Sequence, residues 1–125
     1  MKINSDLIIG DNNYTLKDVD NFLYKQQWSY LGTKTGRVEM DLPKDFNELY
    51  IIVTRDSGRF WIYSMPKLFL TLDYKSFING DCITQQYNAG ACAVDVSLTK
   101  IRLRYVYING ENDKTAVTDW FVYYR

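Results

Sequence analysis

The sequence predicts an all-β protein: a two-sheet antiparallel sandwich of the jelly-roll or immunoglobulin-like kind, preceded by one short N-terminal helix. Three observations predict this fold. From Trp28 onward, short runs rich in Val, Ile, Tyr, Phe, Trp and Thr alternate with turns that contain Gly or Asn. Aromatic residues make up 16% of the 125 residues, and eleven of them are tyrosines, which favour strands. Helical periodicity is confined to one segment near the N-terminus.

The helix is expected in the segment YTLKDVDNFLYK, where apolar residues recur at the spacing of one helical face. The stripe consists of Leu16, Val19, Phe22 and Leu23. A helix of about ten residues is only marginally stable by itself in water, so the stripe must pack either on the body of the domain or on a copy of itself. We therefore divide the chain into an N-terminal connector with a candidate trimerisation element, residues 1–26, and a β-sandwich binding domain, residues 27–125.

Nine candidate strands follow the helix, each bounded by turn residues. They cover residues 28–33, 37–41, 48–55, 59–64, 67–73, 82–87, 91–98, 101–108 and 116–125. Several of the turns between them place Gly or Asn where a tight turn needs a positive φ. This number of short strands in the remaining chain is typical of a sandwich.

Alternation of side chains predicts the apolar faces of two late strands. In 91–98 the apolar face consists of Cys92, Val94, Val96 and Leu98. In 101–108 one face consists of Ile101, Leu103, Tyr105 and Tyr107, and the other of Arg102, Arg104, Val106 and Ile108. Both cysteines, Cys82 and Cys92, are expected to be reduced core residues rather than a disulfide.

The chain ends on TDWFVYYR, which is expected to be a packed strand rather than a polar tail. The turn NGENDK is expected to join it to the strand 101–108, so that 101–125 forms one hairpin. One side of the last strand carries Trp120, Val122 and Tyr124, and the other carries Phe121 and Tyr123. Because both sides are apolar, we expect this strand inside a sheet or against a neighbouring subunit, in the last module of its chain.

Charge and composition argue against several classes of function. The chain has 15 basic and 15 acidic residues, so it lacks the basic excess that binding to nucleic acid requires. No apolar stretch has the length of a membrane span or of a signal peptide core, so neither membrane insertion nor secretion is expected. The absence of histidine removes the usual general base and most zinc and copper sites. We expect a protein that is not an enzyme and needs no cofactor or metal.

Aromatic residues beside polar groups suggest a binding site. Arg59, Trp61 and Tyr63 share one face of a candidate strand, next to a loop that contains Asp56. Sugars stack their C–H faces on such rings while polar groups take the hydroxyls. The alternative is that Trp61 and Tyr63 belong to the core.

Two further clusters are open to two interpretations. Tyr87 and Asn88 lie at an amide-rich hairpin tip, which is either a contact loop or a plain turn. Arg102 and Arg104 form either a solvated sheet face or an anion site.

WSYLGTKTG, the following MDLPKDFNELYIIV and the closing YYR resemble the C-terminal tip (receptor-binding) domains of tail-fibre or baseplate proteins from phages and prophages of Gram-positive bacteria. The resemblance covers about residues 28–125 and carries over no binding residues. It implies a homotrimeric tip in the virion tail, made in the host cytoplasm and attached to upstream tail-fibre or baseplate proteins. Its implied partner is the cell-surface polysaccharide of a bacterial host, and the helical stripe could pack about the threefold axis.

These observations favour a non-catalytic tail domain that binds host cell-surface glycan. Two other functions remain open. One is a structural virion protein whose aromatic residues serve only subunit packing. The other is a small polysaccharide-degrading enzyme with an Asp/Glu pair, since paired carboxylates can hydrolyse glycosidic bonds without histidine.

Overall fold

The computed structural model describes residues 6–9, 12–54, 60–80, 90–108 and 112–125. It contains one α-helix, α1 (Leu16–Lys25), within these residues. The strands are β1 (Asp6–Ile9), β2 (Asn12–Thr15), β3 (Ser29–Thr35), β4 (Glu39–Asp41), β5 (Glu48–Thr54), β6 (Phe60–Pro66), β7 (Lys75–Gly80), β8 (Gly90–Val96), β9 (Lys100–Ile108), β10 (Asn112–Asp113) and β11 (Asp119–Tyr124).

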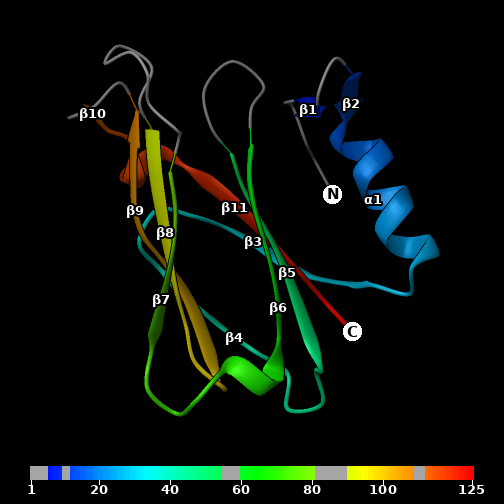
Figure 1. Ribbon diagram of the computed structural model, residues 1–125, viewed down its shortest axis with the longest axis vertical. Coiled ribbons are helices and arrows are strands. Elements are labelled where there is room, and N and C mark those ends of the chain that lie inside the picture. Colours follow the sequence, from blue (N-terminus) through cyan, green and yellow to red (C-terminus); the bar gives the residue numbers. More distant parts are fainter. Residues whose placement is uncertain (1–5, 10–11, 55–59, 81–89, 109–111) are drawn as a thin grey trace.

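The strands form a two-sheet antiparallel sandwich, as the sequence predicts. One sheet has the order β3-β11-β5-β6, and the other has the order β10-β9-β8-β7, with β4 also paired to β9. Strands β1 and β2 pair only with each other. Helix α1 lies beside the β3-β11-β5-β6 sheet, so the molecule has three layers: helix, sheet, sheet (Figure 1). Within the described part of the chain, no helix covers the outer face of the second sheet.

The last strand is central to this arrangement. β11 lies between β3 and β5, inside its sheet, as predicted from its two apolar sides. Trp120 and Val122 point into the core between the sheets, whereas Phe121 and Tyr123 belong to a second apolar cluster on the helix side. The buried Trp120 Nε1 donates a hydrogen bond of 3.0 Å to the carbonyl oxygen of Gly36. Both faces of β11 therefore stabilise the fold.

Helix α1 packs on its own domain. Val19 and Leu23 are 7% and 1% exposed, whereas Phe22 is 60% exposed. The cluster that they join consists of Val19, Leu23, Trp28, Ile52, Phe121 and Tyr123. Val19 and Leu23 are thus not available to pack about a threefold axis, and Phe22 is not part of the buried stripe. The side chain of Leu16, the fourth residue of the predicted stripe, lies outside the described part.

The end of the helix is fixed by a Schellman motif. The backbone N–H of Trp28 donates to the carbonyl of Leu23, and that of Gln27 donates to the carbonyl of Tyr24, at 2.9 Å each. Gln27 has a positive φ of 65°, at the position where glycine is usual. The Arg125 guanidinium lies 4.4 Å from the Trp28 ring centroid and donates to the carbonyl of Gln26 at 2.8 Å. The last residue therefore holds the helix end against the sheet.

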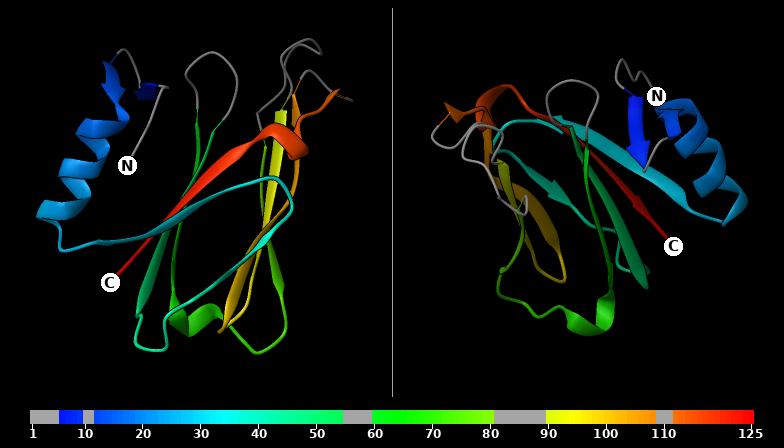
Figure 2. Two further views of the ribbon diagram at one scale, coloured as in Figure 1. Left: turned by 180° about the vertical axis from the view of Figure 1, so that it is seen from behind. Right: turned by 45° about the horizontal axis from the view of Figure 1, so that its top comes forward.

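The chain passes from one sheet to the other between β3 and β4, as the continuous cyan ribbon in Figure 2 shows. Gly36, at this crossing, has a φ of +77°, as predicted for a Gly-containing turn. An added Cβ would lie 3.2 Å from the carbonyl oxygen of Ala116, so the crossing requires glycine. The crossing places the next residue, Arg37, near the edge of β9.

Two predictions about the strands are wrong. Residues 101–125 do not form one hairpin, because β9 and β11 lie in different sheets. β9 turns back into the short β10, and a 3₁₀ helix, Thr115–Val117, leads the chain to the other sheet. Residues 67–73 do not form a strand either: Lys67–Phe69 is a 3₁₀ helix after Pro66, and the strand lies at 75–80. The predicted strand 82–87 and Cys82 lie outside the described residues.

A β-bulge changes the faces of β9. Ala93 pairs with Tyr105 and Val94 with Leu103, so Arg104 has no partner on β8. The core residues are therefore Ile101 and Leu103 before the bulge, and Val106 and Ile108 after it. The predicted strict alternation of 101–108 is wrong beyond Leu103. In β8 the predicted apolar face is confirmed, because Cys92, Val94 and Val96 lie in the core, and Cys92 is a free buried thiol.

Candidate functional site

The aromatic pair that suggested a sugar platform lies inside the sandwich. Trp61 and Tyr63 are 5% and 8% exposed and belong to the core between the sheets. The Tyr63 hydroxyl donates a hydrogen bond of 2.8 Å to the carbonyl oxygen of Cys92, in the opposite sheet, and burial raises the pKa of Tyr63. The prediction that these two rings are exposed to stack on a sugar is therefore wrong, and the alternative, a core position, is confirmed. The predicted contact residues Asp56, Arg59, Tyr87 and Asn88 lie outside the described residues.

Polar residues instead line up across the outer face of the second sheet. The strand registers place Glu39 opposite Arg102, Arg102 opposite Asp95, and Asp95 opposite Ser76. Residues directly opposite each other on antiparallel strands are within reach of side-chain contact. The result is one polar row that runs over β4, β9, β8 and β7.

Asp95 organises this row. Its side chain is only 6% exposed, and a buried carboxylate is stable only when it is paired and hydrogen-bonded. Arg102 Nε donates to Asp95 Oδ2 at 3.0 Å, and Ser76 Oγ donates to Asp95 Oδ1 at 2.5 Å. Arg104 Nη1 in turn donates to Ser76 Oγ at 2.7 Å. One carboxylate thus positions Arg102 directly and Arg104 through the serine hydroxyl.

The row forms part of an open depression of about 500 Å³ in the outer face. It is lined by Arg37, Tyr74, Ser76, Asp95, Arg102, Leu103 and Arg104, and we call it the arginine depression. The Arg102 guanidinium lies over the Tyr74 ring, 4.1 Å from its centroid. The bulge releases Arg104 from strand pairing at this point, and its side chain remains exposed.

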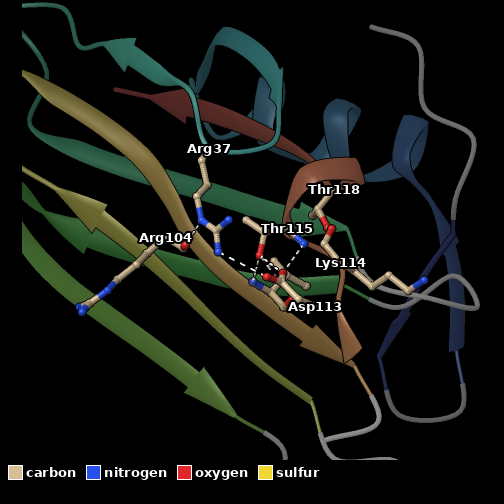
Figure 3. Close-up of polar contacts among 7 residues, drawn as sticks. Arg37, Arg104, Asp113, Lys114, Thr115 and Thr118 are labelled. Atoms are coloured by element: carbon tan, nitrogen blue, oxygen red, sulfur yellow. Dashed lines mark hydrogen bonds and ion pairs between the residues drawn. The ribbon is translucent and has the colours of Figure 1, made fainter. Parts of the chain in front are cut away.

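Arg37 reaches the depression from the edge of the sheet. Its Nε donates to the carbonyl oxygen of Arg104 at 2.8 Å, and its Nη2 lies 3.5 Å from Asp113 Oδ2. Figure 3 shows Arg37 pointing at this strand edge, while the Arg104 side chain extends the other way across the sheet. Thr115 contacts the same edge of β9 further along, where its Oγ1 accepts a hydrogen bond of 2.9 Å from the Val106 N–H. These contacts take the place of a neighbouring strand between β4 and β10.

The titratable side chains at the rim of the arginine depression each keep one protonation state through the neutral pH range. The Tyr74 hydroxyl donates to Glu39 Oε2 at 2.5 Å. Burial and the bond to Glu39 raise the pKa of Tyr74 to about 12, and the same hydrogen bond lowers the pKa of Glu39. Tyr74 therefore stays a neutral donor and Glu39 a carboxylate through the neutral range. Guanidinium groups remain charged throughout.

Sequence reasoning found only part of this site. Arg102 and Arg104 were expected on one face, and the structure places both at the depression. The pairing of Asp95 with Arg102 could have been predicted, because the tight turn at residues 97–100 fixes the register of the flanking strands. The positions of Tyr74 and Ser76 could not be predicted, because the sequence pattern places a strand at 67–73 rather than at 75–80. Arg37 depends on the crossing between the sheets, which local sequence does not specify.

The described residues contain no group of three or more Cys, Asp or Glu side chains that could hold a metal ion. No helix in the described part of the chain is long and apolar enough to cross a membrane.

Comparison with known proteins finds no matching family model, no matching curated protein and no matching solved structure.

Proposed function

We propose that this chain is a non-catalytic binding domain of a phage or prophage tail that recognises glycan on the surface of a bacterial host. The observation that carries the proposal is the arginine depression: a polar, open hollow of about 500 Å³ on the outer face of the second sheet. Hydrogen-bond donors held in fixed positions beside a tyrosine suit a hydroxyl-rich ligand. The resemblance of residues 28–125 to tail tip domains supplies the biological setting.

Two properties of the carboxylates support binding over catalysis. Among the described residues that line the depression, Asp95 is the one carboxylate, and it is engaged by Arg102 and Ser76. Glycoside hydrolysis uses two carboxyl groups, of which the acid has a raised pKa. Glu39, at the rim, has a lowered pKa because Tyr74 donates to it. Glu39 therefore lacks the environment of a general acid, and the Asp95 carboxylate is engaged in structural contacts.

A structural role in the virion is a second candidate, and one observation favours it. Three apolar side chains in or shortly after the 3₁₀ helix Lys67–Phe69 are exposed: Leu68 by 87%, Phe69 by 58% and Leu72 by 79%. Apolar residues gathered on a surface often mark contacts between proteins. Such a surface could pack against another subunit of a tail without any glycan.

Binding to purified host cell walls separates these functions. Retention of the chain on cell walls or on a glycan array, without release of reducing sugar, supports the glycan-binding domain. Lack of retention across candidate hosts favours the structural role, and sugar release that disappears in single Asp→Asn variants favours the enzyme. In a homotrimer, weak binding at each site would be strengthened by avidity. Sedimentation analysis of the whole chain measures the oligomeric state. A monomer mass would refute the trimer.

A further inference from the structure

We propose that the arginine depression is a subsite for an anionic sugar, one that carries a carboxylate or a phosphate group. This inference rests on the proposed function and specifies the class of glycan. Both groups present two or three negatively charged oxygens, and the planar guanidinium group matches the geometry of such oxygens.

The first argument is the balance of charge. The chain as a whole has equal numbers of basic and acidic residues, yet the depression is lined by three guanidinium groups and one carboxylate. Arg37 is paired with Asp113, and Arg102 with Asp95. Arg104 contacts the Ser76 hydroxyl and is paired with no carboxylate among the described residues. The positive charge of Arg104 is therefore the one left for a ligand.

The second argument is that the arginines are held in place. A solvated sheet face would leave long side chains free to move, and ordering them would reduce the gain on binding. Here Arg102 is fixed on one side by Asp95 and on its flat face by the Tyr74 ring. Only its Nε contacts Asp95, so the terminal nitrogens of the guanidinium keep their donor capacity.

The third argument is the direction of the hydrogen bonds. Arg104 donates to Ser76, and Ser76 donates to Asp95, so the single hydroxyl hydrogen of Ser76 is already used. Ser76 can thus accept from Arg104 but cannot offer that hydrogen to a ligand. Asp95 faces the two bonded donors and is shielded from an incoming anion. Apart from the Glu39 carboxylate at the rim, which accepts from Tyr74, the side-chain groups that remain for the ligand are donors, and these favour acceptors with negative charge.

The test uses two ligand pairs, each of which compares an anionic sugar with a neutral counterpart. Galacturonate is compared with its uncharged methyl ester, and glucose 6-phosphate with glucose, each titrated into the whole chain by NMR or calorimetry. We expect the charged member of at least one pair to bind and its neutral partner to bind at least tenfold more weakly. The pair that responds distinguishes a carboxylate ligand from a phosphate ligand. Binding should also weaken with rising salt.

The central variant is Arg104→Gln, which removes the charge and keeps a polar side chain. It is expected to weaken binding of the charged sugar roughly ten- to hundredfold, and Arg104→Lys should recover part of this loss. The matched control is Lys34→Gln, which removes one charge from an exposed position on β3, in the other sheet. It should leave binding unchanged. Because the Arg104 side chain is exposed and forms no ion pair among the described residues, the variant is expected to keep nearly the thermal stability of the parent.

Two results would overturn the inference. One is equal affinity for charged and neutral sugars, or no binding of either. The other is binding of a charged sugar that Arg104→Gln leaves unchanged. Retention on host cell walls that persists in either case would leave the proposed glycan-binding function standing. Loss of cell-wall retention as well would reject the proposed function itself.

Discussion

The packing of α1 on its own sheet leads to a specific prediction for Leu23→Ala. Leu23 is 1% exposed and lies in the same cluster as Trp28, Ile52, Phe121 and Tyr123. Truncation of a buried leucine removes apolar contacts and leaves a cavity, so we expect a loss of about 2–4 kcal/mol in the free energy of unfolding. For a domain of this size that loss lowers the melting temperature by roughly 10 °C.

Urea unfolding followed by circular dichroism and tryptophan fluorescence measures this loss. The matched control is Phe22→Ala, the preceding residue of the same helix, whose side chain is 60% exposed. A surface position of this kind should change the stability by no more than about 0.5 kcal/mol. If Phe22→Ala lowers the free energy of unfolding more than Leu23→Ala does, the described packing of α1 on the sheet is wrong. The same holds for a loss below about 1 kcal/mol in Leu23→Ala, since such a value is too small for a filled core position.

Three further substitutions test local features of the fold. Gly36→Ala should lower the free energy of unfolding by at least about 1 kcal/mol, because Gly36 has a φ of +77° and a Cβ there would crowd the Ala116 carbonyl. Gln27→Gly should instead raise the free energy of unfolding by about 1 kcal/mol, because Gln27 occupies the left-handed position at the C-terminus of the helix. If urea unfolding shows a lower free energy for this variant, that assignment is wrong. In a Cys82→Ser variant, a thiol reagent at pH 8 should label Cys92 only after denaturation, because burial raises its pKa to about 12 and holds it protonated. Rapid labelling of the native protein would contradict its burial.

The fold class could be predicted because it depends on local patterns. Alternating apolar residues and turn residues indicate strands wherever they occur, and the helix near the N-terminus differs from them in period. The central position of β11 follows in the same way, from the two apolar faces around Trp120 and Phe121. The chain thus encodes its layers through side-chain periodicity.

The pairing of strands was harder to predict. A turn between β9 and the final strand suggested a hairpin, but Thr115 bonds to the backbone of Val106 at the edge where that strand would have paired. The apolar run at 67–73 suggested a strand, yet Leu68 and Leu72 are exposed and only Leu70 is buried. Apolar content alone does not say whether a segment is covered. That depends on contacts between residues distant in the chain.

The candidate site was missed for a related reason. The aromatic pattern points to Trp61 and Tyr63, but both rings pack between the sheets, while Phe60 and Ile62 on the other face of the same strand pack against the helix-side cluster. The depression assembles from four separate segments, and its shape depends on the bulge at Arg104. A bulge of one residue leaves little trace in the amino-acid pattern. The candidate binding face is therefore defined only once the strands are paired.

We propose that the outer face of the β7-β8-β9 sheet holds the ligand and that Trp61 and Tyr63, in the core, do not contact it. Backbone amide shifts measured by NMR, during titration with fragments of host cell-wall glycan, locate the ligand on one surface or another. We predict that the shifted amides cluster at Tyr74, Ser76, Asp95, Arg102 and Arg104. Shifts confined to residues 55–59 and 81–89, with this face unchanged, would contradict the proposal.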